Sequence, residues 1–175
     1  SIDHKNINAT VYYITLLIKG EHIKEDYQKA SEYLSKLNTT NDSRKYFLNG
    51  HLSYKKNKFK EAIGHFQEGM KFGDSMCAYK YCKMLFIGEG TKKNVKESNK
   101  NLNKLKKEGH KRSEYFLASF NTLNNNKKFH KLQPETQLIF IVNNIKNIEK
   151  KEKSQTNQTN DEERINAQFD LIIFS

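Results

Sequence analysis

One stretch of this sequence occurs twice, and it decides the fold. Residues 13–30 read YITLLIKGEHIKEDYQKA, residues 81–98 read YCKMLFIGEGTKKNVKES, and the two align without a gap. In this alignment Gly20 corresponds to Gly88, and Leu17 corresponds to Leu85. Each stretch combines apolar residues at helical spacing with a glycine-containing turn and a second helical pattern. Each therefore predicts a hairpin of two helices.

A third hairpin pattern, YFLNGHLSYKKNKFKEAIGHF at residues 46–66, lies between these two and has a shorter turn. One aligned position recurs along the chain at intervals of 36, 32 and 36 residues, and it is occupied by Ile14, Gly50, Cys82 and Ala118. A period in this range is typical of stacked helix pairs. The expected fold is all-α, an α-solenoid of stacked antiparallel helix hairpins.

The residues that repeat point to a known type of unit. The first unit has Leu17, Gly20, Asp26, Tyr27, Ala30, Tyr33 and Leu34, and the third has Leu85, Gly88, Gly90, Asn94, Val95 and Leu102. This pattern resembles the Sel-one-like repeat. The middle unit, with Gly50, Phe59, Ala62 and Phe66, resembles the tetratricopeptide repeat, its relative with a tighter turn. The resemblance covers about residues 5–130 and implies a protein that binds partners rather than one that catalyses a reaction.

Four residues depart from the pattern. His22 stands where the Sel-one-like repeat prefers its second loop glycine, and Ser98 stands where it prefers a packing alanine. Gly64 and Gly69 interrupt the second helix of the middle hairpin. Because a glycine costs about 1 kcal/mol relative to alanine inside a helix, we expect this hairpin to be locally weak.

The pattern also predicts the domain organisation. Three to four hairpins are expected over residues 5–132, a capping helix over 133–150, and a polar linker with a short hydrophobic C-terminal segment over 151–175. Helices are expected at 8–19, 26–37, 43–56, 58–72, 75–87, 95–108 and 113–123. Asp26 is a natural N-cap, and Pro134 suits the first turn of a helix. The apolar segment from Phe169 to Phe174 is expected to fold back as a cap, to dock on another chain, or to be the start of a further domain.

Composition restricts the function classes. The 175 residues carry a formal net charge of +11, mostly from lysine, and asparagine is also abundant, which is consistent with a compositional bias of the source. Cys77 and Cys82 fall on different faces of one expected helix, so they predict small buried residues in a reducing compartment. No signal core or bilayer-spanning run is visible, which favours an intracellular, cytoplasmic location, although the chain could be a fragment.

The resemblance implies where a partner would bind. In tetratricopeptide-like arrays the first helices of the hairpins line a concave surface. Transferred to this sequence, the contact positions are Phe47, His51, Tyr54, Tyr79, Lys83, Phe86 and Tyr115. Such an aromatic surface suits a partner peptide or helix, and the alternative is that the aromatic residues pack between hairpins. A clamp for acidic chaperone tails is disfavoured, because it needs lysine and asparagine where Phe47 and His51 stand.

A lysine-rich stretch offers a second interpretation. Its exposed face would comprise Lys92, Lys93, Lys96, Lys100, Lys104 and Lys107. Such a run usually keeps a protein soluble, but it could also bind nucleic acid, a ribonucleoprotein or another acidic surface. The sequence has no nucleic-acid-binding motif to support this alternative.

Catalytic chemistry finds no support in the sequence. It contains no G-x-S-x-G, P-loop or H-E-x-x-H pattern, and its six histidines are scattered without acidic or thiol partners at useful spacing. We therefore expect a non-enzymatic protein-interaction adaptor or scaffold without a cofactor or a metal.

Overall fold

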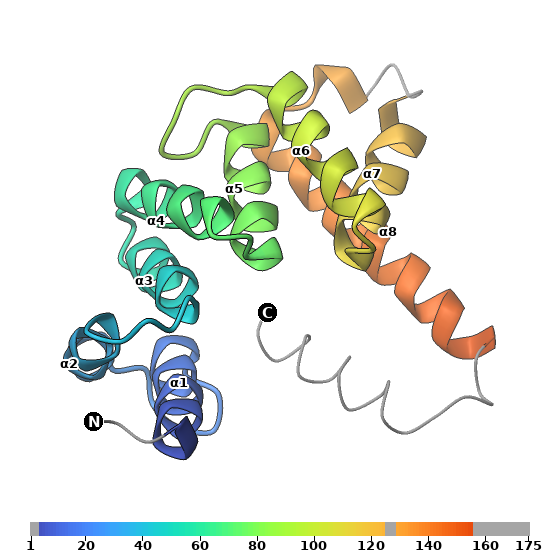
Figure 1. Cartoon of the computed structure of the whole chain (residues 1–175). Coiled ribbons are helices and arrows are strands. Elements are labelled where there is room, and N and C mark those ends of the chain that lie inside the picture. Colours follow the sequence, from blue (N-terminus) through green and yellow to red (C-terminus); the bar gives the residue numbers. More distant parts are fainter. Residues whose placement is uncertain (1–3, 125–128, 156–175) are drawn as a thin grey trace.

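The computed structural model describes residues 4–124 and 129–155, and within these ranges the regular secondary structure is all helical, with loops between the helices (Figure 1). The helices are α1 (His4–Lys19), α2 (Tyr27–Asn38), α3 (Arg44–Lys55), α4 (Phe59–Lys71), α5 (Ser75–Ile87), α6 (Val95–Lys107), α7 (Lys111–Asn124), the short 3-10 helix η1 (Phe129–Lys131) and α8 (Pro134–Gln155). None of the helices in these ranges combines the length and the apolar character needed to cross a membrane.

Consecutive helices pack against each other along the whole described chain. The first helices of successive hairpins also meet, because α1 contacts α3 and α3 contacts α5. On the same side of the array, α8 packs against both α5 and α7; in Figure 1 it runs diagonally behind α6 and α7. We call this side, formed by α1, α3, α5 and α7, the inner face.

The three hairpins share one hydrogen bond at the turn. The residue that caps the second helix donates its backbone N–H to a carbonyl three residues after the aligned position of the first helix. The donor–acceptor distance is 3.0 Å from Asp26 to Leu17, 2.9 Å from Lys58 to Ser53, and 2.9 Å from Asn94 to Leu85. This common geometry explains why the sequence pattern repeats, since the turn fixes how the two helices of each hairpin meet.

The N-caps of the two longer hairpins are also equivalent. The Asp26 side chain accepts a hydrogen bond from the Lys29 N–H at 2.9 Å, and the Asn94 side chain accepts one from the Glu97 N–H at 3.0 Å. The capping role predicted for Asp26 is confirmed. Because an N-cap satisfies an N–H group that has no partner within the helix, each cap specifies where the second helix begins.

Positive backbone dihedrals explain the loop pattern. Gly90 has a φ of 72°, and a side chain there would overlap the backbone carbonyl of Phe59 in the neighbouring hairpin, so only glycine fits. His22, at the equivalent position, has a φ of 65° and is exposed. The first loop therefore keeps the conformation of the third although its residue carries a side chain.

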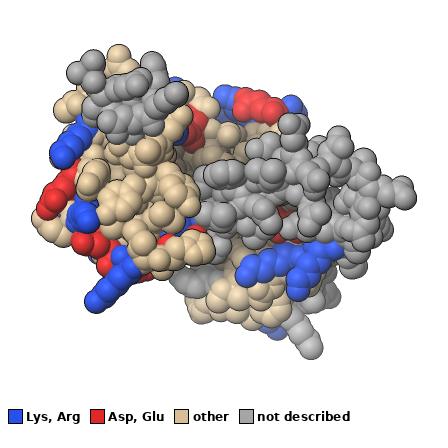
Figure 2. Space-filling view, turned by 90° about the horizontal axis from the view of Figure 1, so that it is seen from below, with Lys and Arg blue, Asp and Glu red and all other residues tan. Residues whose placement is uncertain are grey.

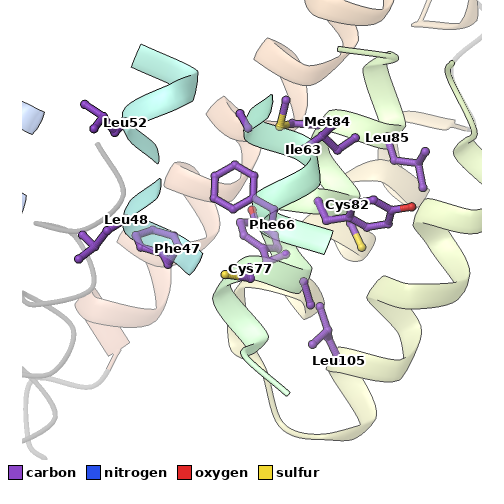
Figure 3. Packing of buried hydrophobic residues seen from close by; sticks show 14 of the residues in the cluster. Phe47, Leu48, Leu52, Ile63, Phe66, Cys77, Cys82, Met84, Leu85 and Leu105 are labelled. Atoms are coloured by element: carbon purple, nitrogen blue, oxygen red, sulfur yellow. The ribbon is translucent and has the colours of Figure 1, made fainter. Parts of the chain in front are cut away.

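The core follows the contacts between hairpins. Phe66 of α4 lies between Phe47 of α3 and the α5 residues Cys77 and Cys82 (Figure 3), and the ring centroids of Phe47 and Phe66 are 6.1 Å apart. Gly50 allows this packing, because a Cβ atom there would come within 2.5 Å of the Phe66 ring.

Two of the departures from the repeat pattern have structural explanations. Ser98 is completely buried, and its hydroxyl donates to the Cys82 carbonyl at 2.9 Å, so the polar side chain is satisfied in the core. Gly69 lies against Cys77, where a larger side chain would overlap the sulfur atom. Gly64, in contrast, has open space around its Cα atom.

The helix bounds agree closely with the sequence prediction at α5 and differ at the ends elsewhere. Helix α8 begins at Pro134, as expected, but continues to Gln155 rather than ending near residue 150. The aligned position is buried at Ile14, Gly50 and Cys82, whereas Ala118 is exposed, because α7 packs against α6 and α8 instead of forming a hairpin of the repeated kind. Residues 156–175, including the segment from Phe169 to Phe174, lie outside the described ranges.

Candidate functional site on the inner face

A recess of about 100 Å³ opens on the inner face where α3, α5 and α8 meet. It is lined by His51, Tyr54, Phe66, Lys80, Lys83, Met84, Ile87, Glu89 and Leu138. Its lining thus combines apolar, aromatic, cationic and acidic groups from α3, α4, α5, the loop after α5, and α8. We call it the inner recess.

Three of the seven predicted contact residues meet at this recess. His51 and Tyr54 come from α3, and Lys83 comes from α5, so the structure brings together positions that lie about thirty residues apart in the sequence. Tyr54 is the most accessible of the three, with 37% of its surface exposed. Burial, and to a lesser extent Glu89, raises the pKa of the Tyr54 hydroxyl to about 12.

Four other predicted contact residues have different surroundings. Phe47, Tyr79 and Phe86 are buried, and Tyr115 is half-buried against the core. Tyr79 and Phe86 both pack edge-on against Phe116 of α7, with ring centroids 6.2 and 5.5 Å apart. The alternative noted above, packing between helices, therefore describes these aromatic residues, and we assign Phe47, Tyr79 and Phe86 to the core rather than to a contact surface.

Five cationic side chains are electrostatically coupled through Lys80, and we call them the cationic cluster; Lys80 and Lys83 line the inner recess. The five are Lys19 of α1, Lys55 of α3, Lys80 and Lys83 of α5, and Arg112 of α7. The charge of Lys80 is repelled by the charges of all four others. Each of the four inner-face helices thus contributes at least one cation to the same region.

Burial and repulsion by neighbouring cations lower the pKa values of Lys19, Lys80 and Lys83. The pKa of Lys80 falls to about 7, chiefly because of burial and then because of the neighbouring cations. The pKa values of Lys19 and Lys83 are also lowered, again mainly by burial. Burial, and then the charges of Lys80, Lys55 and Lys19, lower the pKa of His51 to about 3, so its imidazole is neutral at physiological pH.

Carboxylates offset part of this charge. The Lys19 Nζ atom lies 3.6 Å from Glu21 Oε1, and the Lys55 Nζ atom lies 3.4 Å from Glu25 Oε1. Glu89 favours the charged form of Lys83. Two buried nitrogen atoms, Lys19 Nζ and His51 Nδ1, nevertheless have no hydrogen-bond partner among the described residues. The Lys19 side chain is only 3% exposed, so water does not readily take the place of a partner.

Sequence reasoning missed most of this cluster. Only Lys83 was among the predicted contact residues, whereas Lys19, Lys55, Lys80 and Arg112 were not. One pattern could have found two of them: Lys19 and Lys55 both fall five residues after the aligned position, which is Ile14 in one hairpin and Gly50 in the next. Equivalent positions in stacked hairpins lie one above the other, so identical charges there are expected to be close in space.

The second predicted surface is present as an exposed stripe. All six residues predicted for it, Lys92, Lys93, Lys96, Lys100, Lys104 and Lys107, are exposed. Along α6, Lys96, Lys100 and Lys104 are spaced four residues apart and therefore share one side of the helix. On the face seen in Figure 2, where residues are not grey, basic and acidic side chains are interspersed rather than separated.

The described residues offer little for catalysis. Cys77 and Cys82 are buried and unpaired with each other, and burial raises the pKa of the Cys82 thiol to about 12, so neither is an activated nucleophile. The described part of the chain contains no cluster of three or more histidine, cysteine or acidic side chains that could hold a metal ion.

Comparison of the chain with protein-family models, with curated proteins and with solved structures found no match. The resemblance of its sequence pattern to Sel-one-like and tetratricopeptide-like repeats therefore stays a prediction. Its function has to be inferred from the geometry of the inner face.

Proposed function

We propose that this protein is a non-enzymatic adaptor that binds a segment of a partner protein, a peptide or a helix, on its inner face. The observation that carries this proposal is the meeting of His51, Tyr54 and Lys83 at one recess. A recess that combines an accessible aromatic ring, charged groups and apolar walls can accept a side chain of a partner and orient it by polar contacts.

We also propose that the hairpins are repeats of a short α-solenoid of the Sel-one-like and tetratricopeptide-like type. The hydrogen bond common to the three turns and the equivalent caps at Asp26 and Asn94 support this. Arrays of this kind present extended concave surfaces, which fits a role in assembling other proteins.

Affinity purification from the source cells tests the adaptor proposal. The test compares the unmodified protein with Tyr54→Ala, and Tyr12→Ala is the matched control because Tyr12 is also an exposed tyrosine but does not line the recess. We expect a defined protein to be retained by the unmodified chain and by Tyr12→Ala but lost from Tyr54→Ala. Equal retention by all three would mean that the recess is not the binding surface.

A second candidate function rests on the exposed lysines of α6. These could contact phosphate groups of a nucleic acid or a ribonucleoprotein without reading sequence. In that case the purification would recover RNA or DNA, the yield would fall steeply with salt, and a Lys100→Gln, Lys104→Gln variant would lose it. The Tyr54→Ala variant would then behave like the unmodified protein.

A further inference from the structure

The cationic cluster brings like charges close enough to lower the pKa of a buried lysine. Lys80 and Lys83 of α5 line the inner recess, and the charge of Lys80 is repelled by Lys83, by Lys19 of α1, by Lys55 of α3 and by Arg112 of α7. Concentrating like charges in a partly buried region destabilises a fold, because low dielectric strengthens repulsion. Such an arrangement is therefore typical of a site whose ligand carries the opposite charge.

Two buried nitrogen atoms near the recess also favour a bound ligand that can form hydrogen bonds. Lys19 Nζ and His51 Nδ1 are buried and have no hydrogen-bond partner among the described residues. Both lie near Lys80, which lines the inner recess. The recess, at about 100 Å³, has room for a group larger than a single water molecule, which occupies about 30 Å³ in the liquid.

We propose that the cationic cluster binds a small multivalent oxyanion of the phosphate or sulfate type at the inner recess. The anion would accept hydrogen bonds from the Lys80 and Lys83 ammonium groups that line the recess, and the charges of Lys19, Lys55 and Arg112 would attract it over longer distances. This proposal goes beyond the adaptor function: the anion would occupy the same recess that we propose for the partner segment, but its binding needs no protein partner. Bound there, the anion would reduce the repulsion that the other four cations exert on Lys80.

The surroundings favour a small anion over a nucleic acid strand. Met84, Ile87 and Leu138 form apolar walls of the recess, and α8 packs against α5 beside it. A polymeric backbone would find a far more accessible row of cations on α6. The inner recess instead suits one compact group that can be surrounded from several sides.

Sulfate is the probe for the first test, because its charge stays constant across neutral pH. Binding is measured by isothermal titration calorimetry on the full chain, and the thermal midpoint is measured in sulfate and in chloride at matched ionic strength. The variants are Lys80→Met and Lys55→Met, and the control is Lys96→Met on the exposed stripe of α6. We expect the dissociation constant to be about tenfold weaker in either cluster variant and unchanged in the control.

The control variant is needed because sulfate stabilises most proteins by exclusion from their surfaces. A specific site requires that the rise in thermal midpoint be larger in the unmodified protein and in Lys96→Met than in the cluster variants. An equal rise in all four proteins, without measurable heat of binding, would falsify the proposal. Lys55→Met keeps the test decisive if Lys80→Met does not fold, because Lys55 is one-third exposed and easier to replace.

The pH dependence of sulfate binding gives an independent readout. The titratable and charged groups around Lys80 are His51, Lys83 and Glu89, which line the same recess, and Lys19, Lys55 and Arg112, whose charges also act on Lys80. Because its pKa is about 7, Lys80 loses its proton as the pH rises above 7, and binding a dianion then requires that the proton be restored. The affinity for sulfate should fall up to about tenfold per pH unit above 7.

Orthophosphate, pyrophosphate and citrate are compared at fixed pH to define the ligand. Tighter binding of the two phosphates than of citrate supports the proposed chemistry, and a preference for pyrophosphate would indicate that the natural ligand carries more than one phosphate group. Citrate binding alone, with no response to phosphate or sulfate, would overturn the phosphate-type assignment. The affinity purification described above does not depend on this result, so either proposal can fail separately.

Discussion

At the scale of single residues, the loop between α1 and α2 places His22 in the left-handed backbone region that favours glycine, with a φ of 65°. Gly90 occupies the equivalent position in the third hairpin with a φ of 72°. The His22 side chain is exposed and contributes no buried surface that would offset the strain. The conformation of this loop is therefore specified by its hydrogen bonds and not by the residue at this position.

Replacing His22 with glycine should stabilise the protein by about 0.5–1 kcal/mol, because it removes the steric cost of the left-handed conformation. Urea unfolding followed by circular dichroism measures the change. Lys24→Gly is the matched control in the same loop. Lys24 itself does not have a positive φ, so a glycine there only increases the conformational freedom of the unfolded chain. If His22→Gly is destabilised as much as Lys24→Gly, the loop does not hold this conformation in solution.

Burial of His51 on the inner face makes the stability of the protein depend on pH, because the buried imidazole resists protonation. Its pKa is about 3 in the fold, whereas an ordinary histidine has a pKa of about 6.5, so between these values the unfolded chain binds a proton that the fold rejects. The free energy of unfolding should therefore fall as the pH drops from about 6.5 towards 3. His51→Leu removes this contribution, so the variant should gain up to about 2 kcal/mol relative to the unmodified protein between pH 6.5 and 5. Unfolding curves at several pH values measure this difference, and parallel pH profiles would contradict it.

At the scale of secondary-structure elements, α4 contains two glycines with opposite roles. Gly64 faces open space, whereas Gly69 lies against the Cys77 sulfur of α5. The sequence predicts a weak helix from both glycines equally, because intrinsic propensity does not distinguish them. Only the packing of α4 on α5 separates a tolerated glycine from a required one.

Gly64→Ala should raise the free energy of unfolding by about 1 kcal/mol, the propensity difference between the two residues in a helix. Gly69→Ala should lower it by about 1–3 kcal/mol, because the added methyl group forces α4 and α5 apart. The two variants make the same chemical change in one helix, so each serves as the control for the other. Chemical unfolding monitored by circular dichroism gives both values, and changes of the same sign would contradict the packing described for α4.

The elements themselves were largely predictable, and the site was not. Caps and glycine turns are local features, so the hairpins, the Asp26 cap and the start of α8 at Pro134 follow from the sequence. The burial of Tyr79 and Phe86 depends on α7, and the recess depends on α8, so both need contacts between distant segments. The cationic cluster was missed for the same reason, because its members lie on four different helices.

At the scale of the whole molecule, the two ends of the helical array differ in their contacts because the C-terminal end is packed against α8. The hairpins from α1 to α6 contact mainly their neighbours, which is the arrangement in which stability is nearly a sum of local contributions. Helix α8 departs from this arrangement, because it packs on α5 and α7 at once and adds Leu138 to the inner recess. The stability of the recess should therefore depend more on α5, α7 and α8 than on α1 and α2.

Ile141 and Ile139 of α8 allow this coupling to be measured with a matched pair of substitutions. Ile141 is completely buried, whereas Ile139 is 59% exposed. Ile141→Ala should destabilise the protein by about 2–5 kcal/mol through lost burial and a new cavity, and Ile139→Ala should have a much smaller effect. Because the array is locally coupled, hydrogen exchange in Ile141→Ala should accelerate in α5 and α7 while α1 and α2 keep the rates of the unmodified protein. Uniform acceleration along the chain would instead mean that the helices unfold as one cooperative unit and that α8 stabilises the first hairpin as much as the last.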